Sequence, residues 1–150
     1  MFKKIMNKKM LKNEKGLTLI ELLAVIVILA IVAAIAIPAI GNVISNTREK
    51  AILSDAAGLL SGAKIAITDG ACGVAASSVI TCDNTVLEDV FEGELHADDE
   101  VTYHTTNKVY TVTYSKLLGV KNAKKFTVGS FKPGTDKVIS DSDLNAAMSK

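Results

Sequence analysis

A long apolar run lies near the start of the chain. From Leu22 to Ile37 sixteen consecutive residues are apolar, and the run as a whole extends from Leu17 to Ile40. As an α-helix, these twenty-four residues would be about 36 Å long at ~1.5 Å per residue, which exceeds the ~30 Å hydrocarbon core of a bilayer. The pattern therefore predicts a membrane-spanning helix over residues 17–40.

After Gly41 the apolar residues become confined to one side of the predicted helix. They recur at three- and four-residue spacing, at Ile52, Ala56, Leu59, Ala63, Ala66 and Ile67. Asp69-Gly70 is a helix stop, because glycine permits the left-handed conformation of a C-terminal cap. We therefore expect one helix over residues 17–69, about 80 Å long, with an amphipathic half at 41–70.

Residues 71–150 are rich in turns and alternate between apolar and polar positions. Glu100–Thr106 and Lys108–Ser115 predict a β-hairpin that turns around Asn107. On their spacing, the expected faces are Val101 with Tyr103, and separately Tyr110 with Val112 and Tyr114. Together with the long helix, this predicts an α+β fold in which the second half of the helix packs on a small antiparallel sheet.

Weaker patterns occur around the hairpin. Lys125–Phe131 and Lys137–Ser140 are strand candidates, separated by a turn at residues 132–135. Thr85–Glu92 could form a short helix with Thr85 and Glu88 as its capping box, and Ser140–Met148 could form a terminal helix.

Charge is divided unevenly along the chain. Residues 1–16 hold six lysines and one glutamate, whereas residues 17–150 carry a net charge of −4. A lysine cluster before an apolar span stays on the cytoplasmic side of the membrane. The acidic remainder, with no Trp and few other aromatic residues, argues against a strongly basic nucleic-acid-binding protein.

The lysine-rich start admits a removable secretory signal, a plain anchor or a specialised leader. Ala34-Ile35-Ala36 would be the cut site of a secretory signal, but apolar residues continue beyond it and Glu21 lies inside the run. A carboxylate near the centre of a bilayer costs about 2.5 kcal/mol or more, so Glu21 requires a partner or an interfacial position.

The residues around Glu21 form a longer motif. The segment from Lys15 to Leu23 reads Lys-Gly-Leu-Thr-Leu-Ile-Glu-Leu-Leu and resembles the cleavage and methylation signal of type IV prepilins and pseudopilins. The resemblance implies cleavage by a prepilin peptidase after Gly16, N-methylation of Leu17, and Glu21 as the fifth residue of the mature chain. Pro38 matches the position of a helix-loosening proline, whereas Leu17 replaces the Phe that is usual after the cut.

This resemblance implies a division of the chain and a route through the membrane. Residues 1–16 would be the leader, 17–40 the membrane and filament-core helix, 41–70 its amphipathic half, and 71–150 a β-rich head. The precursor would cross the cytoplasmic membrane once with its N-terminus inside, and membrane assembly machinery would add it to a cell-surface filament of identical copies. Pili of this family serve adhesion, motility, DNA uptake or secretion.

Two residues of the apolar helix have expected roles in assembly. The new amine at Leu17 of one copy could pair with Glu21 of a neighbour and set the axial register of the filament. Pro38 removes a backbone donor, so we expect a kink or local melting over residues 35–41. Such a break would be either a simple bend at the membrane exit or a functional hinge.

The head offers one covalent link and little chemistry. Cys72 and Cys82 fit a disulfide if this part lies outside the cytoplasm, with free thiols as the alternative. His96 and His104 lie near acidic residues without a standard ligand spacing, and the calcium-like run from Asp141 lacks the turning glycine. We therefore expect no metal, no cofactor and no enzymatic activity.

The head is also divided in charge. Residues 83–100 carry eight acids and no Lys or Arg, whereas residues 116–137 carry six lysines and one Asp. The two segments could simply keep the head soluble or could meet between neighbouring copies. The candidate lysines for contact with another subunit or with DNA are Lys116, Lys121, Lys124, Lys125 and Lys132. There are thus two alternatives to a pilus subunit. One is a competence-type pseudopilin with weak DNA binding, and the other is a membrane-anchored domain that never assembles.

Overall fold

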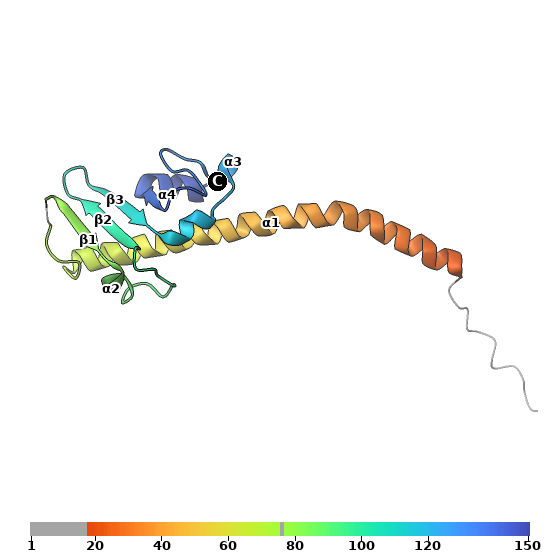
Figure 1. The fold of residues 1–150 in the computed structure, drawn as a ribbon, viewed down its shortest axis with the longest axis horizontal. Helices are drawn as coiled ribbons and strands as arrows, with labels where there is room; N and C mark the ends of the chain where they lie inside the picture. Colours follow the sequence, from red (N-terminus) through yellow and green to blue (C-terminus); the bar gives the residue numbers. More distant parts are fainter. Residues whose placement is uncertain (1–17, 76) are drawn as a thin grey trace, which may run out of the picture. The chain divides into compact units, whose positions relative to one another are not determined.

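The structure is a computed structural model that describes residues 18–75 and 77–150. In chain order (Figure 1) its elements are α1 (Leu19–Thr68), β1 (Val79–Cys82), α2 (Asn84–Leu87), β2 (Glu100–His104), β3 (Val109–Thr113), the 3-10 helix η1 (Ser115–Gly119), α3 (Ala123–Phe126), β4 (Val138–Ser140) and α4 (Asp141–Met148). The chain divides into two compact units, one ending at Asn42 and one comprising Val43–Lys150.

The long helix α1 ends where the sequence predicts. It contains 50 residues and stops at Thr68, just before Asp69-Gly70. Gly70 has a φ of +76°, its N–H donates to the carbonyl of Ile67, and the N–H of Ala71 donates to the carbonyl of Ala66. This is a Schellman cap, which satisfies two carbonyls that the helix would otherwise leave without partners.

The four strands form one antiparallel sheet in the order β1-β2-β3-β4. The predicted hairpin is confirmed, because β2 pairs with β3 and the chain turns between His104 and Val109. Lys108 takes a left-handed φ of +58° in this turn and donates its N–H to the carbonyl of His104.

The predicted separation of the hairpin's faces is wrong. Val101 lies directly opposite Val112, and Tyr103 lies opposite Tyr110, so all four side chains lie on the same face of the sheet. The two tyrosine rings stack with their centroids 4.4 Å apart. Each strand alternates as expected, but the faces of two strands are aligned by the pairing register, which alternation within one strand does not reveal.

Other local predictions are also corrected. β1 lies in a stretch whose sequence shows no strand pattern. The short helix α2 begins after its cap, Asp83, and not at Thr85 as predicted. The helix α3 occupies the start of the segment predicted as a strand over Lys125–Phe131. The terminal helix α4 is confirmed, since the Ser140 hydroxyl accepts from the N–H of Asp143 at its first turn.

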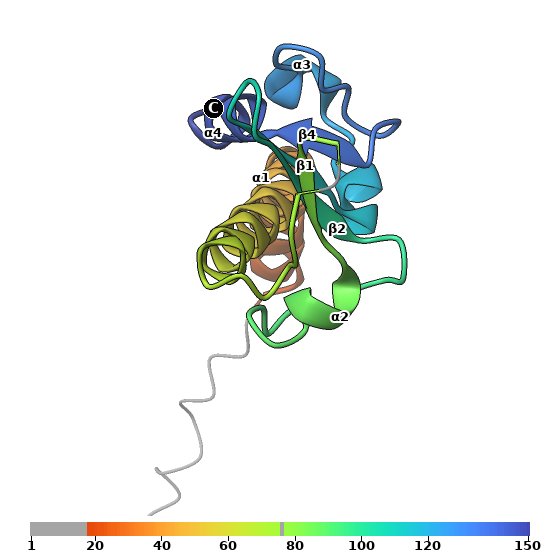
Figure 2. The same ribbon diagram turned by 90° about the vertical axis from the view of Figure 1, so that its left-hand side faces the viewer.

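The core of the Val43–Lys150 unit lies between α1 and the sheet. The predicted apolar stripe of α1 is buried, including Ala56, Leu59 and Ala63, while Ile52 and Ile67 lie partly buried at its edges. Figure 2 shows this part of α1 along one face of the sheet. The chain thus has the predicted α+β, pilin-like fold, with a long N-terminal helix followed by a small antiparallel sheet.

The loop after α2 approaches α1 closely at Gly62 and lies at ordinary contact distance from Gly58. A Cβ on Gly62 would lie 2.7 Å from the carbonyl oxygen of Val90, whereas a Cβ on Gly58 would lie 3.5 Å from the Phe91 ring. Phe91 in turn meets Tyr114 edge to face, with centroids 6.3 Å apart. The absence of a side chain at Gly62 therefore fixes how closely this loop packs.

Candidate functional site

The N-terminal part of α1 presents an apolar surface to its surroundings. Its large apolar side chains from Leu19 to Ile44 are exposed, with fractions from 47% at Val25 to 87% at Leu19. This helix is long and apolar enough to cross a membrane, and its most apolar window is not buried against other described residues. An apolar surface of this extent is unstable in water and requires lipid or other protein as its surroundings.

Glu21 is the one charged residue in this surface from Leu19 to Asn42, and it has local partners. Its carboxylate accepts hydrogen bonds from the backbone N–H and the hydroxyl of Thr18, each at 2.8 Å. The Thr18 hydroxyl in turn accepts from the Glu21 N–H at 3.3 Å. Thr18 and Glu21 therefore form a capping box at the start of α1, a feature that the spacing Thr-x-x-Glu could have predicted.

The structure bears on the other expected residues of the N-terminal segment to different extents. Gly16 and Leu17, the predicted cut and methylation sites, lie outside the described residues. Pro38 lies inside α1, and the helical segment continues on both sides of it. The helix is continuous over residues 35–41, so the expected local melting is not seen there, and the kink at Pro38 stays a prediction.

A buried carboxylate joins α1 to α3. Glu49 is 5% exposed and accepts a hydrogen bond of 2.9 Å from the backbone N–H of Asn122. The side-chain amide of Asn122 also donates to the side-chain oxygen of Asn46 at 2.9 Å, and its carbonyl oxygen accepts from the N–H of Lys125. Asn122 therefore fixes α3 beside the first turns of α1 in the Val43–Lys150 unit.

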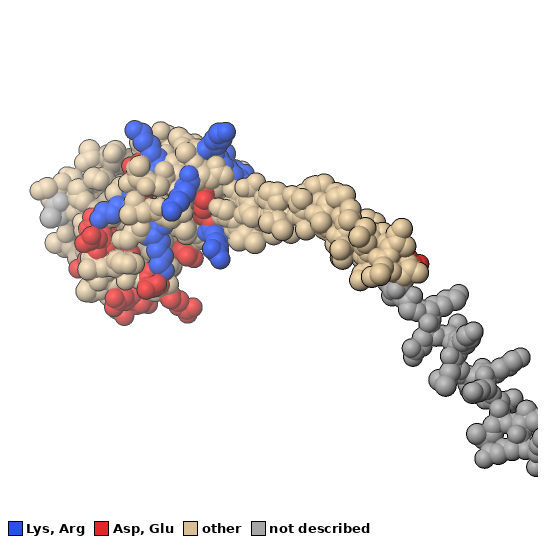
Figure 3. Space-filling model, turned by 45° about the vertical axis from the view of Figure 1, so that its right-hand side comes forward, with Lys and Arg blue, Asp and Glu red and all other residues tan. Residues whose placement is uncertain are grey.

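The predicted contact lysines fall into two groups. Lys116 pairs with Glu94 of the same chain, with the charged atoms 3.1 Å apart. Lys121, Lys124 and Lys132 are exposed, and the ammonium of Lys125 lies 5.5 Å from the centroid of the Phe126 ring. Figure 3 shows Lys and Arg side chains over much of this face of the unit, acidic side chains mainly at its lower left, and some acidic surface between the basic side chains.

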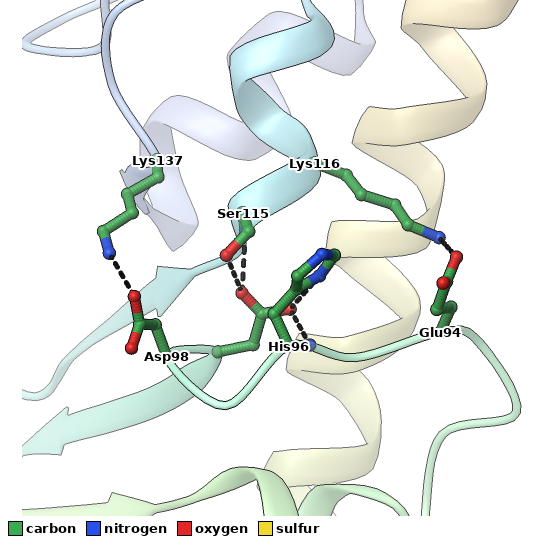
Figure 4. Close-up of polar contacts among 7 residues, drawn as sticks. Glu94, His96, Asp98, Ser115, Lys116 and Lys137 are labelled. Atoms are coloured by element: carbon green, nitrogen blue, oxygen red, sulfur yellow. Dashed lines mark hydrogen bonds and ion pairs between the residues drawn. The ribbon is translucent and has the colours of Figure 1, made fainter.

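Ion pairs connect the acidic segment to the basic one within a single chain. Besides the pair of Lys116 with Glu94, the Lys137 ammonium lies 3.3 Å from the Asp98 carboxylate (Figure 4). The hydrogen bond from Lys116 lowers the pKa of Glu94 and raises that of Lys116. These lysines therefore have intrachain partners before any neighbouring copy is present.

Asp99 is a second buried carboxylate and brings a serine and a histidine together. It is 1% exposed and accepts from the backbone N–H and the hydroxyl of Ser115, both at 2.6 Å, and from the backbone N–H of His96 at 2.9 Å. Figure 4 labels Ser115 and His96 and marks these hydrogen bonds with dashed lines. In a Ser-His-Asp triad the serine would bond to the imidazole, whereas here Ser115 donates to the carboxylate. The cluster thus connects η1 to the loop before β2.

The two cysteines form a disulfide. Cys72 follows the cap of α1, Cys82 ends β1, and their Cα atoms are 4.7 Å apart. Cys82 is fully buried in the core. The bond therefore fastens the first strand of the sheet to the end of the helix. Within residues 18–75 and 77–150, no group of three or more His, Cys, Asp or Glu side chains is arranged to hold a metal ion.

Comparison with known proteins identifies the N-terminal signal. Residues 11–37 match the family model of the prokaryotic N-terminal methylation motif. No curated protein and no solved structure is significantly similar to the chain. The chain therefore carries the processing signal of type IV pilins and pseudopilins, in a pilin-like membrane-anchored precursor, and its head is described by its structure alone.

Proposed function

We propose that this protein is the structural subunit of a type IV pilus or pilus-like filament on the bacterial surface. The proposal rests on one observation above all, namely an exposed apolar helix segment that has a single carboxylate, Glu21, close to its start and that begins inside the matched methylation motif. Packing such helices against one another replaces contacts with lipid by contacts between subunits.

The proposed pathway divides the chain into four segments. Prepilin peptidase removes residues 1–16, and the new N-terminus at Leu17 is methylated. Residues 17–40 form the filament core, residues 41–70 join this core to the head, and residues 71–150 form the surface of the filament together with the amphipathic half of α1. Membrane assembly machinery extracts the subunit from the cytoplasmic membrane.

The role of Glu21 in this pathway can be separated from its role as a cap. Thr18 supplies hydrogen bonds to the carboxylate but no positive charge. We propose that the Leu17 amine of a neighbouring copy supplies that charge in the filament, where water is excluded. The pairing would then fix the axial register.

The test uses two matched variants of the full chain. Glu21→Gln keeps a side chain that can form a capping box but removes the charge, whereas Thr18→Ala keeps the charge and removes the box. We expect Glu21→Gln to be inserted and processed but not assembled, and Thr18→Ala to form filaments. Normal filament yield from Glu21→Gln would contradict the charge-pairing role.

Mass spectrometry of the mature N-terminus tests the processing step itself. A methylated Leu17 supports the proposal. A chain that starts at Ile37 would indicate an ordinary secretory signal, and a chain that still starts at Met1 would indicate a plain anchor whose head never enters a filament.

A further inference from the structure

Six cations around the first turns of α1 in the Val43–Lys150 unit form a group that we call the basic collar. It consists of Arg48, Lys50, Lys121, Lys124, Lys125 and Lys132. Arg48 and Lys50 lie on α1, and the hydrogen bonds of Asn122 to Asn46 and Glu49 hold the α3 lysines beside them. A Cβ on Gly134 would lie 4.0 Å from the Cα of Lys121, so the turn that carries Lys132 belongs to the same region.

The collar is rich in positive charge. Residues 43–54 and 120–135 together contain six cations and one acid, Glu49, and Asp55 and Asp136 follow directly after the two segments. That acid is buried and bonded to the backbone of Asn122. Among the described residues, no carboxylate oxygen lies within 4.0 Å of the charged nitrogen of a collar cation, although Asp136 accepts from the backbone N–H of Lys132 at 2.7 Å; Lys116 and Lys137 outside the collar both have ion-pair partners.

The position of the collar along α1 matches the headgroup layer of a membrane. Val43 and Ile44 are exposed apolar residues, 63% and 49% accessible, and the first cations follow at Arg48 and Lys50. At ~1.5 Å per residue, Arg48 lies about 6 Å beyond Ile44 along the helix. The headgroup region is about 5–7 Å thick on each side of the hydrocarbon core. The collar therefore falls at phosphate depth when the core boundary lies at Ile44, four residues beyond the predicted 17–40 span.

We propose that the basic collar binds anionic phospholipid headgroups on the outer face of the membrane and holds the head against the bilayer until the subunit is extracted. This inference rests on the membrane-anchored precursor of the proposed function but not on filament formation. Lysines close to an anionic surface are attracted by its negative potential, and the attraction weakens within one Debye length.

The chain contains no Trp, so a single introduced Trp can report the environment of the collar. Ala123 is exposed at the start of α3, next to Lys124, and Thr105 is exposed in the turn between β2 and β3. The full-length Ala123→Trp chain is reconstituted at low density in vesicles of zwitterionic lipid with increasing phosphatidylglycerol. A trace of lipid with a nitroxide on its headgroup serves as quencher, and Thr105→Trp serves as the control reporter.

We expect phosphatidylglycerol to shift the Ala123→Trp emission to shorter wavelength and to increase its quenching, with little change for Thr105→Trp. Adding Lys124→Gln and Lys125→Gln removes two collar charges, whereas Lys108→Gln with Lys150→Gln removes two exposed charges outside it. Each lysine near an anionic surface contributes about five-fold, so the collar pair should lower the ratio of docked to free heads about twenty-five-fold. Lys121→Gln with Lys132→Gln provides a second collar pair that leaves α3 unchanged.

Several results would overturn the proposal. Equal effects of the collar and control pairs would contradict lipid binding by the collar. The same holds if phosphatidylglycerol has no effect on a chain that floats with the vesicles. Both results would leave the proposed function intact. Failure to float with the vesicles would remove the membrane anchor on which both depend. A response to duplex DNA in zwitterionic vesicles, without one to phosphatidylglycerol, would identify a nucleic-acid surface, and a response that follows protein density would identify contact between copies.

Discussion

Replacing Gly62 with alanine tests whether the loop after α2 is seated on α1 as closely as the structure shows. The new Cβ would lie 2.7 Å from the carbonyl oxygen and 3.1 Å from Cγ2 of Val90. The backbone or the loop must therefore move, since a carbon atom does not approach a carbonyl oxygen this closely. Gly58→Ala is the matched control, because its Cβ would make an ordinary contact of 3.5 Å with Phe91.

The two substitutions share one energetic contribution and differ in another. Alanine in place of glycine inside a helix stabilises by about 0.5–1 kcal/mol at both positions. Overpacking costs about 1–3 kcal/mol and applies at Gly62 alone. We therefore expect Gly58→Ala to raise the free energy of unfolding by about 0.5–1 kcal/mol, and Gly62→Ala to lie about 1–3 kcal/mol below it, because the shared contribution cancels in the comparison.

Urea unfolding in detergent micelles measures this difference. Near-ultraviolet circular dichroism follows the head selectively, since all three tyrosines, Tyr103, Tyr110 and Tyr114, lie there and the chain has no Trp. With a slope of about 1.5 kcal/mol per molar urea, the midpoints of the two variants should differ by about 0.7–2 M. Equal midpoints for Gly58→Ala and Gly62→Ala would refute the close approach of Val90 to the helix.

Three further perturbations follow from the structure. Replacing Cys72 and Cys82 together by alanine should lower the free energy of unfolding by about 2–3 kcal/mol through the lost loop constraint, and reduction of the parent chain should reproduce that loss in the urea midpoint. The Thr85 hydroxyl and the backbone N–H of Val86 donate to Asp83 and lower the pKa of its carboxyl below the ordinary value. The stability that these hydrogen bonds confer is therefore present above the ordinary pKa of Asp and disappears as the pH falls through the folded pKa. The Asp83→Ala chain should be less stable than the parent at neutral pH, and the difference should shrink in acid, as urea midpoints at several pH values can show. Glu49→Gln keeps one acceptor for the N–H of Asn122 but removes its charge, and should destabilise by about 1 kcal/mol; hydrogen exchange of the Asn122 amide is the local readout, and unchanged protection would contradict the bond.

The sequence by itself determined the features that depend on local pattern. The membrane-length apolar run, the amphipathic continuation of α1 and its end just before Gly70 follow from helical periodicity and from the left-handed conformation that glycine accepts. The hairpin follows from alternation on either side of a turn, and the methylation signal follows from residues close together in the chain.

Tertiary structure decided what depends on residues far apart in the chain. Glu49 lies between two cations in the sequence, a pattern that is typical of a solvent-exposed residue. It is buried because the backbone N–H of Asn122, 73 positions later, donates a hydrogen bond to its carboxylate. The alignment of Tyr103 with Tyr110 depends on the pairing register, and the four residues of β1 become a strand because β2 offers an edge to pair with. Periodicity describes a residue's neighbours on its own element, whereas burial and register are fixed by the surfaces that other elements bring to it.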